Sequence, residues 1–533
     1  MRFASWFLCA ASLWACTPQA AVPAQTPPTE QTPPPTNWKQ VEPAKQKHAL
    51  VPEPAGVPAA DASCQQFIEP PSAGCSKSTS DLDALAQAMQ SKEPRERDRL
   101  LSCLESSPAF APGVLRALRA EFAPECADVL ALPLLEPRRA DLTRSIEDTL
   151  IALAASGRLR RLVQKAPELS PPFDRARFMD FFQSTLKPWI VTQAAAIHDL
   201  AAVGPQLSSY AKGVIAIEAG LADMRFVSVV RQVPLPKEMS DDAEVRDAYY
   251  AALDEALEPR KARGRDAALV GLRELANEGV VFDPRVQRAR ALLSEVYSGR
   301  RIDALDKLLL PELLPAPTDT SERSLAGQLP SFYAGVLLAG STLDAPLLRA
   351  LMERGLPKAF TTQLASEKLD EASKALLAIA WFERGRVYFR AEDFASSARL
   401  SDLPKPSPEQ ALYHALASSL QNGPRDGTDL LLRGPQLPSS TAQVQELDRI
   451  AAQKTAVAPL AAFDAAYLLG LVPPPNDPKF WDALAKRFET ASRQLNNAAQ
   501  KKNAHEASVA AKETARALRQ SPASPTTPPP TAK

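Results

Sequence analysis

The sequence has little glycine, few histidines and no excess of charge of either sign. Only 20 of the 533 residues are glycine, which disfavours glycine-rich phosphate-binding folds and tightly turned β architectures. The 62 basic and 62 acidic side chains balance, so the chain lacks the basic footprint of a dedicated nucleic-acid-binding protein. The four histidines are isolated from one another in the sequence: His48, His198, His414 and His505. We therefore expect no cofactor, no metal site and no nucleic-acid partner.

The N-terminus carries an apolar run that is too short to span a bilayer. Met1 and Arg2 form a minimal positive region, and Phe3 to Leu13 is uncharged and mostly apolar. A transmembrane helix needs about 20 such residues. A short apolar run behind a positive start is typical of a secretory signal peptide, so this segment is excluded from the fold.

The apolar run ends in Leu13-Trp14-Ala15-Cys16, which resembles the lipobox of bacterial lipoproteins. In that family a diacylglycerol is attached to the cysteine, and the peptide is cut just before it. Leu13 and Ala15 match the motif, whereas Trp14 replaces the small residue that is usual between them. The resemblance implies a signal peptide over residues 1–15, lipidation of Cys16 and a membrane anchor. The alternative is an ordinary secretory signal followed by a chance cysteine.

The residue after this cysteine bears on where such a lipoprotein would reside. In some bacteria an aspartate at this position marks retention in the inner membrane, and this chain has Thr17 instead. The resemblance therefore implies an outer-membrane lipoprotein that faces the periplasm or the cell surface.

Four cysteines remain once Cys16 and the signal peptide are set aside. They are Cys64, Cys75, Cys103 and Cys126, and no cysteine follows them. An even number of cysteines in an exported chain indicates disulfides, and the wide spacing without a CxxC pair argues against zinc. Of the three possible connectivities we expect Cys64–Cys75 and Cys103–Cys126, because short loops close most easily.

Proline-rich stretches occur near both ends of the chain. Eleven prolines and only scattered apolar side chains lie between Thr17 and Ala60. Such a composition cannot bury enough surface to offset the entropy lost on ordering. We therefore expect residues 16–60 to form a disordered tether that starts at the lipidated cysteine, and residues 521–533 to form a disordered tail.

Between residues 61 and 520 the apolar residues recur at helical spacing. After Asp141, which is expected to cap the first turn, leucine and isoleucine recur at three- and four-residue steps up to Ala154. Gly157 is expected to follow the end of that helix, and Asp242–Leu257 is a similar block. No block alternates in β-branched and aromatic residues, so we expect no sheet. The sequence predicts an all-α fold of about twenty short helices.

Short helices with short links, in a chain of this length, favour an α-solenoid of helical hairpins flanked by the proline-rich tails. Trp381-x3-Gly385-x2-Tyr388, followed by Phe394, resembles the first helix and turn of a tetratricopeptide repeat. In that family the glycine lets two helices pack closely, and the aromatic residues fill the seam. Arg384 replaces the usual leucine, and the second helix departs from the family pattern. The resemblance covers about one repeat.

These observations divide the chain into six segments. They are a signal peptide (1–15), a lipidated tether (16–60), a disulfide-containing helical segment (61–135), an α-solenoid (136–475), a long C-terminal helix (476–520) and a disordered tail (521–533). Within the C-terminal helix, residues 480–499 keep a three-then-four apolar spacing and are expected to pack on the last hairpin. Residues 500–520 are expected to run on as an exposed helix.

The motifs that resemble catalytic sites are incomplete. His505-Glu506 begins like the HExxH zinc motif, but Val509 takes the place of the second histidine. Ser209 and Lys212 have the SxxK spacing of penicillin-binding serine enzymes without the other motifs of those enzymes. The sequence also lacks GxSxG, P-loop and GxGxxG motifs. We therefore predict that the protein is not an enzyme.

Aromatic pairs are the remaining candidates for a partner-binding surface. They are Tyr249 with Tyr250, and Trp381 with Tyr388. In solenoids some aromatic residues line the concave face and bind extended segments of partners. The alternative, that these side chains belong to the core, applies to most aromatic residues at helical spacing.

Two classes of function remain. The first is a lipid-anchored scaffold or adaptor of the cell envelope that binds a protein or a cell-wall component through a helical-repeat surface. The second is an exported enzyme or a relative of cell-wall hydrolases with an unrecognised active site. Glu105-Ser106 resembles the acid of lytic transglycosylases, but none of the glycine-rich motifs of that family follows it. We expect the first class, with a membrane attachment through lipid and a protein partner in the envelope.

Overall fold

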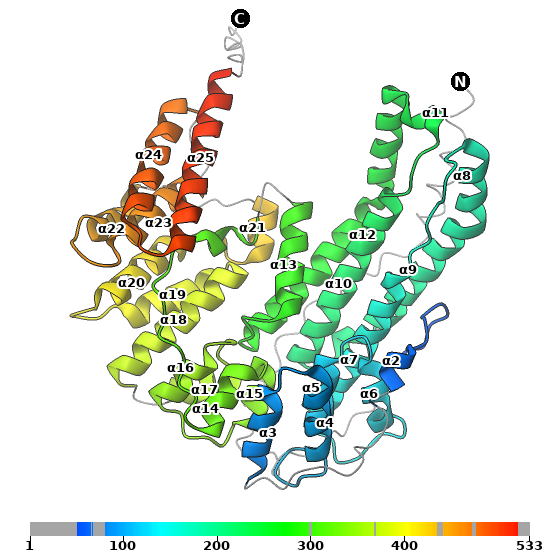
Figure 1. The fold of residues 1–533 in the computed structure, drawn as a ribbon, viewed down its shortest axis with the longest axis horizontal. Helices are drawn as coiled ribbons and strands as arrows, with labels where there is room; N and C mark the ends of the chain where they lie inside the picture. The colour runs from blue at the N-terminus through cyan, green and yellow to red at the C-terminus, as the bar shows by residue number, and fades with distance from the viewer. Residues whose placement is uncertain are drawn as a thin grey trace, which may run out of the picture. The chain divides into compact units, whose positions relative to one another are not determined.

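The computed structural model describes residues 51–65, 67, 80–297, 301–366, 369–433, 441–471 and 476–520. Throughout these residues the chain forms helices joined by turns and loops, without a β-strand (Figure 1). The prediction of an all-α fold is confirmed. Cys16, Cys75 and the tail at residues 521–533 lie outside the described residues.

The chain divides into two compact units, and each is described by itself. Unit 1 comprises Met1–Ala289, Pro317–Leu343 and Ala350–Glu367. Unit 2 comprises Arg290–Ala316, Asp344–Arg349 and Lys368–Lys533. The chain passes from one unit to the other within helix α13 (Pro284–Val296), so the segment predicted as one solenoid, 136–475, contributes to both.

Unit 1 begins with short helices and continues with long ones. The short helices are α2 (Ala62–Gln65), α3 (Asp81–Gln90), α4 (Pro94–Leu104), α5 (Val114–Phe122) and α6 (Ala127–Leu135). Then follow α7 (Arg144–Gln164), α8 (Arg175–Phe181), the π-helical η2 (Phe182–Leu186), α9 (Lys187–Ala201), η3 (Gly204–Gln206), α10 (Ser209–Arg231), α11 (Lys237–Ser240) and α12 (Ala243–Asn277). Later parts of the chain add α14 (Ser321–Gln328), α15 (Ser331–Leu337) and α17 (Lys358–Ser366).

Helix α7 differs at both ends from the prediction. Its N-cap is Thr143 and not Asp141. Gly157 does not follow its end, since the helix continues to Gln164. A Cβ atom at Gly157 would lie 3.1 Å from the carbonyl oxygen of Pro124, just before α6. The glycine therefore allows α7 to pack closely against the start of α6.

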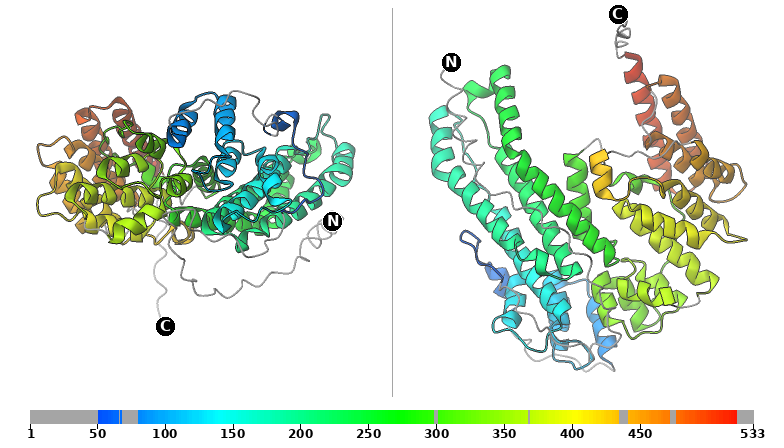
Figure 2. Two further views of the ribbon diagram at one scale, coloured as in Figure 1. Left: turned by 90° about the horizontal axis from the view of Figure 1, so that it is seen from below. Right: turned by 180° about the vertical axis from the view of Figure 1, so that it is seen from behind.

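Helices α10 and α12 run antiparallel and pack along each other (Figure 2). They approach each other through two pairs of glycines. A Cβ atom at Gly220 would lie 2.7 Å from the carbonyl oxygen of Gly264. A Cβ atom at Gly271 would lie 2.8 Å from the carbonyl oxygen of Gly213. No larger residue fits at these positions without moving a backbone, so the glycines fix the separation of the two helices.

Pro259 lies inside α12, beyond the end of the predicted block Asp242–Leu257. A proline inside a helix normally ends or kinks it because it removes a backbone hydrogen bond. Here Leu257 before the proline and Leu269 and Leu272 after it are all buried. Packing on both sides of Pro259 therefore keeps the chain helical.

Unit 2 contains a short 3₁₀ helix and the later helices of the chain. They are η4 (Ala304–Lys307), α18 (Glu371–Tyr388), α19 (Ala391–Ser401), α20 (Pro408–Leu420), α21 (Gly427–Arg433), α22 (Thr441–Ala451), α23 (Ala458–Leu471), α24 (Pro478–Gln494) and α25 (Ala498–Gln520). Helix α16 (Ala345–Leu351) crosses from unit 2 to unit 1. From α18 to α20 and from α22 to α25 each helix packs on the next, as in an array of helical hairpins (Figure 2).

The turn between α18 and α19 carries the residues that resemble a tetratricopeptide repeat. A Cβ atom at Gly385 would lie 2.9 Å from the ring of Phe394, so the glycine allows α19 to approach α18. The ring of Phe382 fills the seam, 5.5 Å from the ring of Phe394 and 5.3 Å from that of Tyr413. Membership of the repeat family stays a prediction, because this packing involves one helical hairpin.

The predicted long C-terminal helix is instead a helical hairpin. Helix α24 ends at Gln494 and α25 begins at Ala498. Asn497 caps α25, with its Oδ1 accepting hydrogen bonds from the N–H groups of Ala499 (2.8 Å) and Gln500 (3.1 Å). The chain reverses here without a glycine or a proline.

Helix α25 packs along α24 and is not the exposed extension that the sequence predicts. Ala504, Ala511 and Ala515 are buried. The hydroxyl of Ser508, also buried, donates to the carbonyl oxygen of Ala485 on α24 at 3.0 Å. These small residues recur at three- and four-residue steps and form the face of α25 that packs on α24, although alanine and serine give only a weak hydrophobic signal in the sequence.

Candidate functional site

Cys64 and Cys126 form a disulfide near the start of the described chain. Their Cα atoms lie 5.4 Å apart, although 62 residues separate them in the sequence. Cys103 is also disulfide-bonded. The predicted pairs Cys64–Cys75 and Cys103–Cys126 are therefore wrong, because the fold and not the loop length brings Cys64 to the N-cap of α6. Residues 51–60, which precede this disulfide, form a non-helical segment that we call the first strap.

Two arginines of α7 bind the backbone of the first strap. Nη1 of Arg158 donates to the carbonyl oxygens of Val51 (3.1 Å) and Pro52 (2.5 Å). Nε of Arg161 donates to the carbonyl oxygen of Pro58 (3.0 Å). Hydrogen bonds from a charged donor are stronger than neutral ones, so these contacts hold the strap at both of its ends.

A single carboxylate, that of Asp128 on α6, fixes both guanidinium groups. Its two oxygens accept hydrogen bonds from Arg161 at 2.7 and 2.6 Å, and one lies 3.6 Å from Nε of Arg158. The three side chains are only 7–10% exposed, and burial at this depth requires paired charges. We call Asp128, Arg158 and Arg161 the strap site. Because these side chains hold residues 51–60, the expectation that all of residues 16–60 form a disordered tether is wrong for this part.

Gly56 brings the middle of the first strap against α9. Its φ is +86°, a conformation that favours glycine. A Cβ atom there would lie 2.5 Å from the Cγ2 methyl of Thr192. A larger residue at this position would therefore separate the strap from the body of unit 1.

Unit 2 holds a second proline-containing segment, residues 308–316, which we call the second strap. The N–H of Leu309 donates to Oδ1 of Asp464 on α23 at 2.8 Å. Asp464 is fully buried, and its Oδ2 has no hydrogen-bond partner among the described residues. Burial raises the pKa of this carboxyl well above its usual value.

Two carbonyl groups of the second strap accept hydrogen bonds from other parts of unit 2. Nε2 of Gln500 donates to the carbonyl oxygen of Leu310 (3.4 Å), and Arg349 donates to that of Leu314 (2.5 Å). The Leu314 side chain is 83% exposed. The strap is therefore held by its backbone, while this leucine faces solvent.

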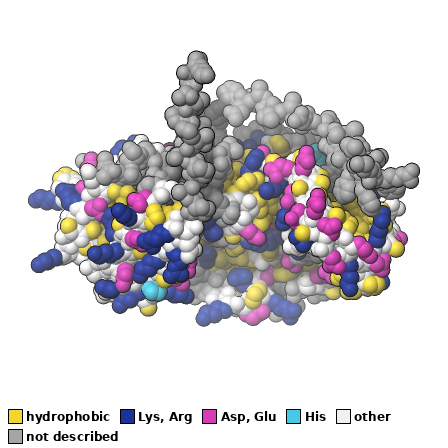
Figure 3. Space-filling model, turned by 90° about the horizontal axis from the view of Figure 1, so that it is seen from above, with side chains coloured by type: hydrophobic (Ala, Val, Ile, Leu, Met, Phe, Trp, Pro, Cys, Tyr) yellow, Lys and Arg dark blue, Asp and Glu magenta, His cyan; other side chains and the backbone are white. Residues whose placement is uncertain are grey.

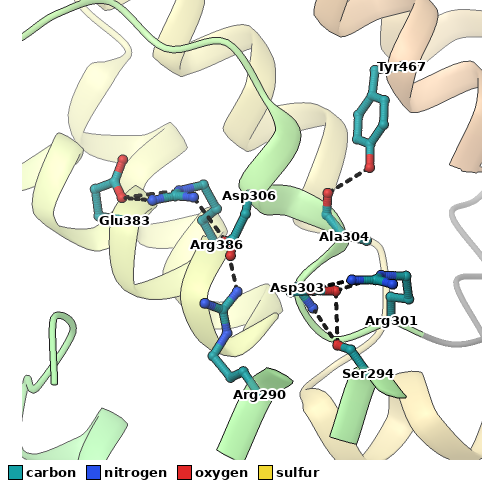
Figure 4. Close-up of polar contacts among 9 residues, drawn as sticks. All are labelled: Arg290, Ser294, Arg301, Asp303, Ala304, Asp306, Glu383, Arg386 and Tyr467. Carbon is teal, nitrogen blue, oxygen red and sulfur yellow. Dashed lines mark hydrogen bonds and ion pairs between the residues drawn. The ribbon is translucent and has the colours of Figure 1, made fainter. Parts of the chain in front are cut away.

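A polar network fixes η4, which leads into the second strap. Figure 4 shows Asp306 between two arginines, Arg290 of α13 and Arg386 of α18. Its Oδ1 accepts hydrogen bonds from them at 2.7 and 3.0 Å. Arg386 also donates to Glu383 at 2.6 Å. Each charge in this group faces an opposite charge, which is typical of a structural network.

The start of η4 and the residues just before it are fixed by a second set of contacts, also drawn in Figure 4. Asp303 accepts hydrogen bonds from Arg301 (2.9 and 2.7 Å) and from the hydroxyl of Ser294 (2.9 Å). The hydroxyl of Tyr467 donates to the carbonyl oxygen of Ala304 at 2.7 Å, and burial raises the pKa of this tyrosine. These contacts set the position from which the second strap leaves η4.

Unit 1 contains a buried cluster around Glu121. Its carboxylate pairs with Arg285 and accepts hydrogen bonds from the hydroxyls of Tyr210 (3.3 Å) and Tyr333 (3.5 Å). Burial and the Glu121 charge both raise the pKa of Tyr210. Helices α5, α10, α13 and α15 each contribute one of these residues, so the cluster holds four helices together.

Tyr249 and Tyr250 are both half-buried on α12 and remain candidates for a partner-binding surface. Their rings lie edge to face, 5.4 Å apart. The guanidinium of Arg231 lies 5.5 Å from the Tyr250 ring and pairs with Asp254. Burial raises the pKa of Tyr249 to about 12.

The surroundings of this tyrosine pair are acidic. Residues 237–258 carry eight acidic and two basic side chains. Figure 3 shows acidic side chains gathered toward the right of the described surface, the side on which Figure 1 places α11 and α12. We call the tyrosine pair and these acidic residues the α12 surface. Its charge favours a basic partner.

Trp381 and Tyr388 belong to unit 2, so the structure does not assign the two predicted aromatic pairs to one site. Tyr388 is 3% exposed and is part of the core. Trp381 is half-buried beneath the guanidinium of Arg384, which lies 4.0 Å from the ring centre. Arg384 in turn donates to both carboxylate oxygens of Asp393 on α19. The arginine at the position of the family's leucine therefore covers the tryptophan.

The chain was compared with protein-family models, curated proteins and solved structures. None of them matches it. Among the described residues no helix is long and apolar enough to cross a bilayer. The same residues contain no group of three or more His, Cys, Asp or Glu side chains that could hold a metal ion. Function is therefore inferred from the contacts that this chain makes.

Proposed function

We propose that the protein is a lipid-anchored scaffold or adaptor of the cell envelope, which holds a protein or cell-wall partner on its helical surface. The lipobox-like Leu13–Cys16 motif supports anchoring through lipid at Cys16, and Thr17 supports the outer membrane. The Cys64–Cys126 disulfide supports an oxidising compartment such as the periplasm. In this proposal the protein does no chemistry itself.

The observation that carries the proposal is the way helices hold two non-helical segments of the same chain. Side chains of α7 bond the first strap, and side chains of α23 and α25 bond the second. All of these bonds end on backbone groups. A proline-containing segment offers backbone carbonyls that no internal hydrogen bond occupies. Helices that hold such segments in cis have the chemistry needed to hold those of a partner.

The α12 surface is where we place the partner. Tyrosines are frequent anchors of protein interfaces because they combine a large apolar ring with a hydroxyl. Tyr249 and Tyr250 are accessible in part, and the acidic side chains around them would pair with basic groups. The partner in this proposal therefore presents a basic surface or segment.

Photo-crosslinking in cells tests this placement. A crosslinking amino acid at position 250 of the full chain should form an adduct with a discrete partner, whereas one at the exposed Lys405 in unit 2 should not. Charge reversal with Glu244→Lys and Asp247→Lys should reduce the adduct at position 250, because the partner loses its counter-charges. Equal amounts of adduct at both positions, or an adduct at position 250 that the charge reversal does not reduce, would contradict the proposal.

Fatty-acid labelling tests the anchor separately. Cys16→Ser should abolish incorporation of labelled fatty acid and leave the protein uncut or soluble. Cys9→Ser, which changes only the signal peptide, is the matched control and should still be labelled. Continued processing and labelling of the Cys16→Ser chain would refute lipidation at this residue.

A further inference from the structure

The hydrogen bonds that the strap site makes to the first strap all end on one kind of group, the backbone carbonyl. Nη1 of Arg158 and Nε of Arg161 both donate to backbone carbonyl oxygens, those of Val51, Pro52 and Pro58. Asp128 pairs with both guanidinium groups. These donors suit a chain segment that presents free backbone carbonyl groups.

This donor pattern defines the chemistry of the ligand. Proline has no N–H, and a proline-containing segment without internal hydrogen bonds leaves its carbonyl groups available. Two arginines and one aspartate leave the site with a net positive charge. The only acidic side chain of the strap nearby is that of Glu53, between two prolines, with its carboxylate 3.8 Å from Arg158 and 84% exposed. The site thus fits an extended segment with prolines and an acidic residue between them.

We propose that the strap site is a peptide-binding site for extended, proline-containing segments of a partner protein, and that the first strap occupies it in cis. An incoming segment displaces the strap and takes over its carbonyl contacts. The disulfide of Cys64 to Cys126 keeps the strap of each chain beside its own site, which disfavours exchange between two copies. This proposal does not depend on the lipid anchor or on the envelope location.

A labelled peptide with the sequence of residues 49–60 tests the proposal on the full mature chain. The unmodified chain should bind it weakly, because the strap in cis competes at high effective concentration. Gly56→Val should strengthen binding at least about tenfold, because the added side chain meets Thr192 and expels only the strap. The dissociation constant measured by fluorescence anisotropy reports the change. If Gly56→Val does not fold, Gly56→Ala meets the same methyl group and replaces it.

Two controls decide whether the peptide binds at the strap site. A peptide that itself carries valine at the position of Gly56 should not bind the opened chain. Arg158→Lys, added to Gly56→Val, keeps the charge but lacks the planar fork and should weaken binding about tenfold. Equal affinities of the unmodified and Gly56→Val chains, absence of binding to both, or insensitivity to Arg158→Lys would overturn the proposal. A dimer of the unmodified chain that the peptide dissociates would overturn it in favour of strap exchange between copies.

Discussion

The two straps differ in the buried carboxylic acid group that helps to hold them. In unit 1 charged donors face strap carbonyls, and Asp128 compensates their charge. In unit 2 a buried carboxyl, Asp464, faces a strap N–H, and its second oxygen has no described partner. A buried group pays a desolvation cost that only partners can offset. The first strap is therefore held by compensated charge, whereas the second contacts a buried carboxyl whose pKa is raised by burial.

The largest effect is expected at the covalent end of the first strap. Cys64→Ser opens a loop of 62 residues, and the chain-entropy model gives a loss of about 4 kcal/mol in the free energy of unfolding. The amides of residues 51–60 should then exchange hydrogen faster, whereas those of the second strap should not. Chemical denaturation and hydrogen exchange measure the two effects. Unchanged exchange in the first strap would show that the arginines alone hold it.

Removing the carboxylate of the strap site is expected to have the next largest effect. Asp128→Ala leaves two buried guanidinium groups without their common partner, at a cost of about 3 kcal/mol in the free energy of unfolding. Asp141→Ala is a matched control, because it breaks an exposed pair with Arg139 and should cost less than about 1 kcal/mol. Denaturant titration of both variants measures the difference. Similar losses in the free energy of unfolding for the two variants would mean that the buried pairs of the strap site contribute no more than an exposed ion pair.

Asp464→Asn should change the free energy of unfolding in the opposite direction and stabilise the protein by about 1–2 kcal/mol at pH 7. Burial raises the pKa of Asp464 above its unfolded value, so the folded state holds a proton that the unfolded state releases. Stability therefore falls as the pH rises from the unfolded pKa to the folded pKa. Asparagine does not titrate, so the variant lacks this fall, and its amide oxygen can still accept the hydrogen bond from the N–H of Leu309. Denaturation between pH 3 and pH 8 measures the slope. An asparagine variant that is less stable at every pH would contradict this account.

The smallest effect is expected at Asn497, which caps α25 and donates to Glu312 of the second strap at 2.6 Å. Asn497→Ala should cost about 1 kcal/mol through loss of the cap. Asn497→Asp keeps a capping oxygen but places a carboxylate beside Glu312. If the cap dominates, the aspartate variant should lie closer to the natural chain than the alanine variant does in thermal unfolding. The reverse order would assign the effect to the contact with the strap.

The fold class follows from the sequence because helical periodicity is a local signal. Leucine and isoleucine spacing after Asp141 predicted α7, whereas its ends depended on Thr143 and on the packing of Gly157, which spacing alone does not reveal. The predicted block Asp242–Leu257 stopped short of Pro259 for a similar reason, since the helix continues through the proline because of burial on both sides of it. The break at Asn497 was missed because asparagine caps a helix less conspicuously than proline or glycine ends one.

The candidate site was hidden because its recognition is directed at backbone atoms. Carbonyl groups carry no residue signature, so the proline content of residues 51–60 indicated only disorder. One signal was present, however. Arg158 and Arg161 continue the stripe of Leu150 and Ala154 at four- and three-residue steps, which places two cations on a buried face. The even count of cysteines indicated a disulfide, but its partners depended on the fold.

The glycine pairs of α10 and α12 constrain the length of these helices as well as their composition. Each residue of an α-helix turns the chain by about 100°. One residue inserted between Gly213 and Gly220 would therefore rotate one glycine off the contact line and bring a side chain against the backbone of α12. Deletions would act in the same way. The outer faces of this hairpin can accept many substitutions, whereas its register admits no insertion or deletion between the glycines.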